Sequence, residues 1–434
     1  MKTTIERVWA RQVWDSRGRP TVEAEVSLAD GSLGRAIAPA GASRGAHEAL
    51  ELRDGGAAFG GRGVDRAVEH VRDEINDALR GLDGADQAEV DAALVKLDAT
   101  PNKARLGANA LTAVSMACLH AAAASAREPL WRHLAEGRPV RLPLPEVQIF
   151  GGGAHAGRRT DVQDFMIMAP RAGSFRRALE ITAEVYFAAG ALMEARGPLA
   201  GVADEGGWWP SFASTEDALG ALTSAIERAG HRPGEDVFIS LDIAANELYR
   251  KDHYELAGDG VTLEGPGMAE RVIGWGRRWP ILSIEDPAAE DDLATMAAVL
   301  AGLDGRVQVV GDDVLVTNTR RIAHAARERA CNAALIKVNQ AGTITEAKAA
   351  LEAARGAGWG TIVSARSGES EDVTIAHLAV GWDAGQLKVG SFSRSERMAK
   401  WNEVLRIEEA LGAQAVFAGE GAFCASVAGA LAAK

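Results

Sequence analysis

Acidic residues follow several short apolar segments in the second half of the chain. Asp242 ends the segment SLD, Glu285 ends ILSIE, and Asp312 follows VVG. A single acidic residue at such a place is usually a helix cap or a turn residue. Three carboxylates confined together would repel one another strongly, and a divalent cation relieves that repulsion. Because oxygen ligands alone favour Mg²⁺, the pattern predicts a magnesium site.

Basic residues lie in or directly after other apolar segments, and one of them could act as a base at such a site. Lys337 ends the segment ALIK, Lys388 lies in QLKV, and Arg366 follows VSA. A cation bound to a substrate carboxylate stabilises the enediolate that forms when the α-proton leaves. Lys337 must be neutral to accept that proton, and we expect the metal and Lys388 to lower its pKa. The predicted chemistry is therefore removal of a proton next to a carboxylate.

These residues end predicted strands that alternate with helices. Strands are predicted at residues 164–168, 237–241, 281–284, 307–310, 333–337, 361–364 and 386–389, with helices at 174–195, 215–229, 293–302, 319–329 and 343–355. Such alternation predicts parallel strands joined by right-handed crossovers. The number of units fits an α/β fold of the (β/α)₈ barrel type better than an open sheet. Barrels of this type place their active sites at the carboxyl ends of the strands.

The first third of the chain has strands before helices. Apolar and polar residues alternate at 3–14 and 21–28 around the turn-rich DSRGRP, and a third strand is predicted at 34–38. Helical patterns follow at residues 64–80, 85–97 and 108–126. This order predicts an α+β domain. Three prolines within 136–145 mark a boundary, so we predict domains at residues 1–136 and 137–434.

Composition narrows the classes of function. The 434 residues carry a formal net charge of −13, which disfavours nucleic acid and anionic membranes as partners. A small anionic substrate remains compatible, because a metal and local cations can reverse the sign inside a cleft. Cys118, Cys331 and Cys424 form no CxxC pair, which indicates a reducing compartment. The sequence suggests no signal peptide and no membrane span, so we expect a cytoplasmic protein.

Ordered sequence blocks resemble those of enolases along nearly the whole chain. The blocks are VWDSRGRPTVEAEV, AGASRGAHEALELRD, GANALTAVSMA, GGGAHAGRRTDVQDFMIM, DEGG, SLDIAANELY, SIEDPAAEDD, VVGDDVLVTNT, ALIKVNQAGTITEA, VSARSGESED and RSERMAKWNEVLRIEE. The resemblance implies an N-terminal α+β capping domain and a modified TIM barrel that begins ββαα. It also implies a homodimer or a higher homo-oligomer, and loss of water across C2–C3 of a phosphorylated carboxylate.

The resemblance also implies roles for individual residues. Asp242, Glu285 and Asp312 would hold one Mg²⁺ and Ser43 would bind a second, so two Mg²⁺ ions are expected per active site. By position, the other roles are a base at Lys337, an acid at Glu205, a second catalytic carboxylate at Asp164, a partner of the substrate carboxylate at Lys388, phosphoryl ligands at Arg366 and Ser367, and further site residues at His155, Gln163 and Arg44. For His155 an ordinary loop histidine is the alternative, and for Gln163 a structural hydrogen-bonding residue.

Several residues depart from the enolase pattern close to these positions. Ala365 replaces a histidine near the phosphoryl end, Asp164 replaces a glutamate, and Arg44 replaces a threonine. Arg158 and Arg159 follow the His155 loop, and DEGG precedes two tryptophans. Lost bulk and added arginines would suit a larger or more anionic phosphoryl end, if these side chains face the same pocket.

The favoured hypothesis is a branch of the family found in phosphonate antibiotic pathways. Its members convert 2-phosphonoformylglycerate to carboxyphosphonoenolpyruvate. The main alternative is a glycolytic enolase acting on 2-phosphoglycerate. A non-catalytic enolase-like binding protein, and an acid-sugar dehydratase or racemase of the wider superfamily, are further alternatives. The retained lysines and carboxylates disfavour the non-catalytic alternative, because a scaffold has no need of that charge arrangement.

Overall fold

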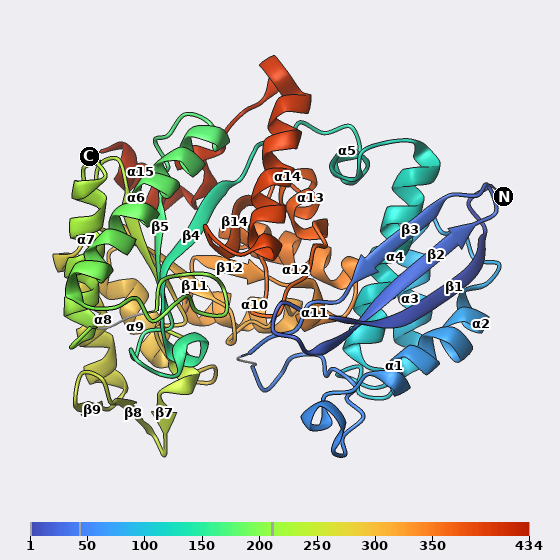
Figure 1. Cartoon of the computed structure of the whole chain (residues 1–434), viewed down its shortest axis with the longest axis horizontal. Coiled ribbons are helices and arrows are strands. Elements are labelled where there is room, and N and C mark those ends of the chain that lie inside the picture. Colours follow the sequence, from blue (N-terminus) through green and yellow to red (C-terminus); the bar gives the residue numbers. More distant parts are fainter. Residues whose placement is uncertain (1, 43–44, 210–211, 434) are drawn as a thin grey trace.

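The computed structural model describes residues 2–42, 45–209 and 212–433. Figure 1 shows a smaller N-terminal unit beside a barrel surrounded by helices. The smaller unit begins with an antiparallel sheet of β1 (Ile5–Trp14), β2 (Pro20–Leu28) and β3 (Leu33–Ile37). Asp15 shapes the first turn, because its Oδ1 accepts the backbone N–H groups of Arg17 at 2.8 Å and Arg19 at 3.0 Å.

Helices cover one face of this sheet. They are α1 (Asp65–His70), a π-helical turn (Val71–Ile75), α2 (Asn76–Leu79), α3 (Gln87–Asp98), α4 (Ala108–Ala126) and α5 (Leu130–Ala135). By length and apolar composition α4 could cross a membrane, but 83% of its apolar window is buried within the protein. It packs against β2 and β3, so α4 is the core helix of an α+β unit, as the sequence predicts.

Eight strands close into a barrel in the order β10-β11-β12-β13-β14-β4-β5-β6. Their bounds are β4 (Leu144–Gly151), β5 (Asp164–Met168), β6 (Phe238–Asp242), β10 (Ile281–Glu285), β11 (Gln308–Gly311), β12 (Ala333–Ile336), β13 (Gly360–Ser364) and β14 (Gly385–Ser391). A small separate sheet contains β7 (Tyr249–Arg250), β8 (His253–Leu256) and β9 (Val261–Leu263).

The expectation of parallel strands throughout is wrong for β5. It runs antiparallel to both β4 and β6, while the other barrel neighbours are parallel. No full helix of crossover length separates β4 from β5, so the chain simply turns back. Two helices, α6 (Phe175–Arg196) and α7 (Thr215–Arg228), follow before β6. The ββαα start implied by the resemblance is therefore confirmed.

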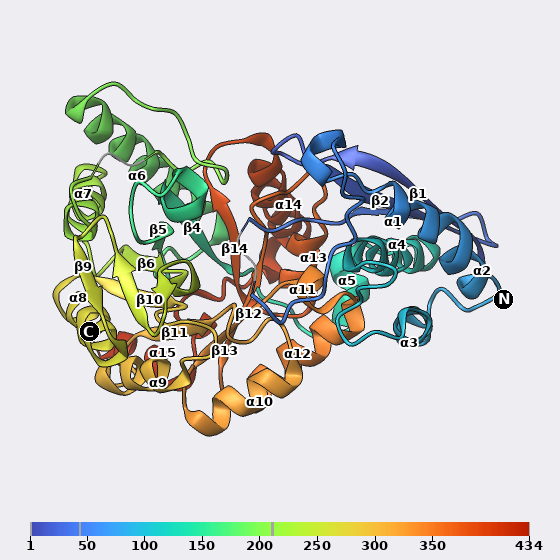
Figure 2. The same ribbon diagram turned by 90° about the horizontal axis from the view of Figure 1, so that it is seen from below.

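Helices form the outer layer of the barrel. They are α8 (Gly265–Arg278), α9 (Leu293–Gly302), α10 (Thr319–Glu328), α12 (Ile344–Gly356), α13 (Thr374–Gly381) and α14 (Ser395–Leu411). The short α11 (Val338–Ala341) is buried directly after β12, and α15 (Ala425–Ala432) packs near the amino ends of β4, β6 and β10. The segment after β3 reaches from the N-terminal sheet to the barrel (Figure 2). Ala40 pairs with Gly368, and the Ala49 N–H donates to the Gln340 carbonyl at 2.9 Å. The N-terminal unit thus helps to enclose the carboxyl ends of the barrel strands.

Candidate active site

The predicted metal ligands lie at neighbouring strand ends. Asp242 is the last residue of β6 and Glu285 the last of β10, and these two residues are paired in register. Asp312 directly follows β11, the next strand of the barrel. All three side chains are buried. The parallel register of β6, β10 and β11 therefore brings the carboxylates to one end of the barrel, as the sequence predicts.

Two lysines bind these carboxylates. Lys388, on β14, places its Nζ 2.9 Å from Asp242 Oδ2 and 2.7 Å from Glu285 Oε2. Lys337 follows β12 and forms an ion pair with Asp312 Oδ2. One ammonium group comes from the opposite side of the barrel and one from the strand next to β11, and together they offset much of the mutual repulsion of the carboxylates.

Amide side chains complete the surroundings of the same carboxylates. Gln163 Nε2 donates to Asp242 Oδ2 at 3.2 Å, and Gln340 Nε2 donates to Asp312 Oδ1 at 2.8 Å. The structural alternative for Gln163 is therefore compatible with its place at the site. Gln340 lies in the enolase-like block ALIKVNQ, but nothing in its residue type or spacing marked it as a site residue.

The pKa shifts reflect this crowding. Burial raises the pKa of Glu285 well above its usual value, and the charge of Asp242 adds to that rise. Burial lowers the pKa of Lys337, but the charges of Asp312 and Glu285 act in the opposite direction, and the net shift of the Lys337 pKa is upward. The protein's own groups therefore do not produce the expected lowering of the Lys337 pKa, although Arg366 and Lys388 act in that direction.

The donor set fits a hard divalent cation. Asp242, Glu285 and Asp312 offer carboxylate oxygens only, which is the chemistry that Mg²⁺ prefers. Glu285 Oε1 is buried and has no hydrogen-bond partner among the residues that the structure describes. A buried, unpartnered carboxylate oxygen is costly unless a cation or a donor satisfies it. Ser43, predicted to bind a second Mg²⁺, lies outside the described residues.

A second cluster faces the lysines across the same cavity. His155 Nδ1 lies 3.2 Å from Asp164 Oδ1, and its Nε2 lies 3.1 Å from Ser367 Oγ and 3.9 Å from Glu205 Oε1. All four side chains are buried. Asp164 begins β5, whereas Glu205 lies in the loop between α6 and α7. His155 thus contacts three other predicted site residues.

The His155 cluster predicts a pH dependence of stability. Burial lowers the pKa of His155, but the charges of Asp164 and Glu205 outweigh it and raise the pKa from 6.5 to about 9. A raised folded-state pKa stabilises the protein fully below the unfolded value, and this contribution is lost as pH rises to about 9. Wild type should therefore lose up to roughly 3 kcal/mol of stability relative to His155→Gln across that interval, at about 1.4 kcal/mol per pKa unit.

Denaturant unfolding of the two proteins between pH 6 and pH 9.5 measures this difference. His324→Gln is the matched control, because His324 pairs with Glu328 at the surface. A difference between wild type and His155→Gln that stays constant with pH would contradict the assignment of a buried imidazolium.

Arg366 and Ser367, the predicted phosphoryl ligands, follow β13. Arg366 forms a buried ion pair with Glu48 at 3.0 Å and donates to Asn339 Oδ1 at 3.0 Å. Ser367 Oγ accepts the Ala42 N–H at 3.3 Å. Glu48 and Asn339 were not identified from the sequence, although both lie in enolase-like blocks. An anion bound by Arg366 would have to share this guanidinium with Glu48.

Most of the predicted residues line one small cavity. Its lining is His155, Gln163, Asp164, Glu205, Asp242, Lys337, Ser364, Ala365, Arg366, Ser367, Lys388 and Val389. Its volume of about 20 Å³ holds about one water molecule. A substrate larger than a water molecule therefore fits only if side chains around the cavity move. Glu285 and Asp312 bind the lining lysines from just outside it.

The arginines that favoured a larger anionic substrate do not line this cavity. Arg158 is largely exposed and pairs with Glu247 at 2.6 Å. The Arg159 guanidinium lies 5.0 Å from the ring centroid of Trp209. Of the departures at this end of the site, Ala365 alone is in the lining among the described residues, and Arg44 lies outside them.

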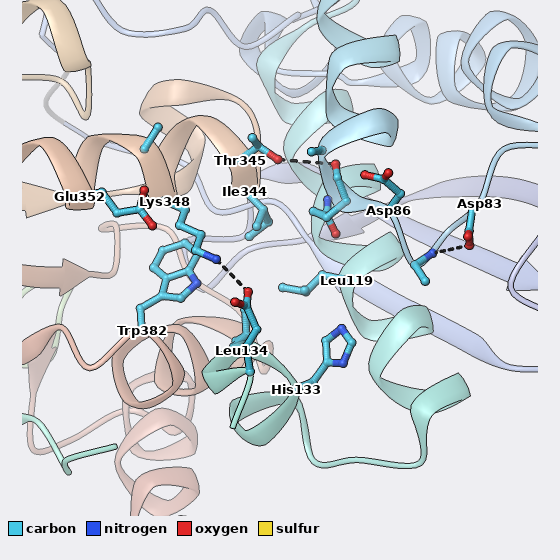
Figure 3. Close-up of a pocket in the computed structure, with 15 residues that line it drawn as sticks. Asp83, Asp86, Leu119, His133, Leu134, Ile344, Thr345, Lys348, Glu352 and Trp382 are labelled. Carbon is cyan, nitrogen blue, oxygen red and sulfur yellow. Dashed lines mark hydrogen bonds and ion pairs between the residues drawn. The ribbon is translucent and has the colours of Figure 1, made fainter. Parts of the chain in front are cut away.

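A larger cavity, of about 690 Å³, lies elsewhere, between the N-terminal unit and the barrel helices. Figure 3 shows Leu119 and His133 on one side of it and Ile344 and Trp382 on the other. None of the predicted site residues lines it. The predicted site residues that line a cavity therefore line the small polar one and not this larger one.

Two family models match the chain. The model described as "Enolase, N-terminal domain" matches residues 5–134, and "Enolase, C-terminal TIM barrel domain" matches residues 139–426. Together they account for nearly all of the α+β unit and the barrel. Enolases are hydro-lyases that typically use Mg²⁺, and the buried carboxylates and lysines at the barrel mouth agree with that chemistry. The chain belongs to the enolase family and is a lyase of the hydro-lyase type.

Proposed function

We propose that the protein removes water across C2–C3 of a 3-hydroxy carboxylate that carries a phosphoryl group at C2. The observation that carries this proposal is the placement of Lys337 and Glu205 in one cavity. Lys337 adjoins the predicted metal carboxylates, and Glu205 adjoins the His155 cluster. An acid and a base facing one small cavity suit an elimination in which a proton and a hydroxyl leave neighbouring carbons.

The reaction divides between the two sides of the cavity. The C2–H bond breaks as Lys337 Nζ takes the proton, and its electron pair forms the enediolate. The C3–O bond then breaks as Glu205 protonates the leaving hydroxyl, and the C2=C3 bond forms with release of water. Lys388 pairs with the substrate carboxylate, and Arg366 with Ser367 holds the phosphoryl group. His155, paired with Asp164, places a compensating positive charge beside Glu205. Gln163 orients Asp242 through its hydrogen bond.

Asp242, Glu285 and Asp312 would hold the Mg²⁺, which when bound supplies the positive charge that stabilises an enediolate. Lys337 and Lys388 would compete with that ion for the oxygens of these carboxylates, so the lysine–carboxylate ion pairs would weaken. Asp312 then raises the pKa of Lys337 less, and the lysine can become the neutral base that proton removal requires. Two Mg²⁺ ions per site, with Ser43 on the second, remain part of the proposal.

For the substrate, we propose 2-phosphonoformylglycerate or a similar phosphonate analogue. Ala365 supports this, because its small methyl group lines the cavity next to Arg366, where a histidine would occupy more volume. Arg158 and Arg159 do not support it, because Arg158 pairs with Glu247 and Arg159 lies over the ring of Trp209, and neither lines the cavity. The alternative, 2-phosphoglycerate, needs the same base, acid and metal ligands, so only the phosphoryl end separates the two.

Competing substrates test this choice. We expect kcat/KM for 2-phosphonoformylglycerate to exceed that for 2-phosphoglycerate by at least about tenfold, or about 1.4 kcal/mol. Ala365→His should narrow or reverse the preference, because it fills the space and adds a donor. Ser364→Ala is the matched control beside it. A wild-type preference for 2-phosphoglycerate would assign the glycolytic reaction. Turnover of neither would favour a binding protein.

The homodimer or higher homo-oligomer implied by the family resemblance is also part of the proposal. Light scattering coupled to size-exclusion chromatography measures it directly. A monomer at micromolar concentration would contradict it.

A further inference from the structure

A buried glutamine, Gln148, links Asp164 to the loop that carries Glu205. Gln148 lies on β4 and is fully buried in the barrel. Its Nε2 donates to Asp164, and its Oε1 accepts the backbone N–H of Gly207 at 2.8 Å. The orientation of the amide is fixed, because a backbone N–H can only donate and must therefore face the oxygen. Asp164 then receives an N–H donor from the same side chain.

Gly207 lies two residues after Glu205, so this contact fixes the loop that carries the proposed acid. A Cβ atom at Gly207 would lie 2.5 Å from Gln148 Oε1 and 2.8 Å from the backbone nitrogen of Gly151, so an added side chain would have to displace the Gln148 amide or the β4 backbone. The approach of Gln148 to the loop is therefore close enough to require glycine there. The Glu205 carbonyl also accepts the Ser391 N–H at 2.9 Å, which holds the loop on its other side.

The base lies in a separate network. Lys337 and its partner Asp312 receive their contacts from β11, β12 and α11, including the Gln340 amide. No hydrogen bond joins Gln148 to Lys337 or Asp312 within residues 2–42, 45–209 and 212–433. A change at Gln148 should therefore disturb the acid side of the cavity and leave the base side in place.

We infer that Gln148 is a positioning residue that fixes Asp164 and the Glu205 loop relative to each other for the departure of the C3 hydroxyl. The inference rests on the proposed function and deepens it. One neutral side chain with a donor and an acceptor at a set spacing can hold both groups at once, and neither an acid nor an apolar residue can. Loss of this link should slow elimination while C2 proton exchange by Lys337 continues.

The experiment compares two activities of the same variants. NMR in D₂O measures exchange of the C2 proton, and ultraviolet absorbance of the enol product measures dehydration. 2-Phosphoglycerate and 2-phosphonoformylglycerate are both used. Gln148→Met keeps the length of the side chain but removes both hydrogen bonds. We expect its ratio of exchange rate to dehydration rate to rise at least about tenfold, which is less than the 10²–10⁴-fold that general acid catalysis typically contributes, because Glu205 itself is retained.

A matched control and a second variant guard against a purely structural effect. Gln308→Met removes another fully buried barrel glutamine, whose Nε2 donates to Ser283 and Gln386 at 3.0 Å. This control should leave the ratio unchanged. Gly207→Ala displaces the Gln148 amide from the loop side, and it should raise the ratio if Gln148→Met does not fold.

The outcomes separate the inference from the proposed function. Suppose that wild type exchanges and dehydrates, and that neither Gln148→Met nor Gly207→Ala changes the ratio of exchange rate to dehydration rate. That result overturns the positioning role alone. Equal loss of both activities in these variants does the same. Wild type with neither activity on either compound overturns the proposed function, and the positioning role with it.

Discussion

Lys337→Ala is expected to abolish exchange of the C2 proton and dehydration together. Lys337 is buried at the end of β12, lines the cavity and has Asp312 as its ion-pair partner. If it is the base, its removal should cost at least roughly 10²–10⁴-fold in both activities, the usual contribution of a positioned proton acceptor. Exchange followed by NMR in D₂O reports on this step without requiring the hydroxyl to leave.

The matched control is Lys348→Ala. Lys348 lies on α12, shortly after Lys337 in the chain, and pairs with Glu136 at 2.9 Å in the larger cavity, away from the predicted site. Its loss should change neither activity by more than about twofold, because an exposed ion pair contributes little. Lys337→Arg retains the charge but stays protonated at any working pH, so it should remain inactive. Normal exchange in Lys337→Ala would sink the assignment of the base.

The different behaviour of Lys337→Ala and Gln148→Met is the strongest link between geometry and mechanism. The lysine variant should lose both activities, whereas the glutamine variant should lose mainly dehydration. If the two variants differ in this way, proton removal at C2 and departure of the C3 hydroxyl are separate steps that use separate groups around one cavity. A single loss of binding would instead lower both activities in both variants by similar factors.

The strand ends were predictable because their pattern is local. Asp242, Glu285 and Asp312 each follow a run of apolar residues, so a short window of sequence identifies both the strand and the charge that ends it. Parallel register then brings these ends together without further information. Lys337 and Lys388 were predictable for the same reason, because each lies in or at the end of a short apolar segment.

The missed features depend on contacts between distant segments. Strand β4 was not predicted, because Glu146 and Gln148 interrupt its apolar pattern, although both are buried inside the barrel. Gln148 meets Gly207 only in the folded chain. The direction of Arg158 depends on Glu247. No property of these residues in the sequence states which neighbour they will have.

Mg²⁺ should stabilise the wild-type protein and should stabilise Glu285→Gln much less. The glutamine has nearly the same shape and still accepts a hydrogen bond from Lys388, so the fold should persist. It removes one of three negative charges, and we expect Mg²⁺ affinity to fall at least about 100-fold, beyond the 10–100-fold typical for loss of an outer partner of a metal ligand. Titration calorimetry measures the affinity, and thermal unfolding with and without Mg²⁺ measures the stabilisation.

The affinity should also rise with pH. Burial and the charge of Asp242 raise the pKa of Glu285, so at lower pH a proton competes with Mg²⁺ for this carboxylate. Asp91→Asn is the matched control, because Asp91 is a buried carboxyl whose pKa is raised by burial, and it accepts hydrogen bonds from Ser115 and Thr345 away from the cavity.

Equal stabilisation of wild type and Glu285→Gln by Mg²⁺ would place the ion elsewhere, and the neighbouring group of Asp286, Asp312 and Asp313 would be the next site to test. Because Asp286 already accepts the N–H groups of Asp312 at 2.9 Å and Asp313 at 2.8 Å, its carboxylate holds the strand end in place, and Glu285, with its unpartnered oxygen, is the better ligand.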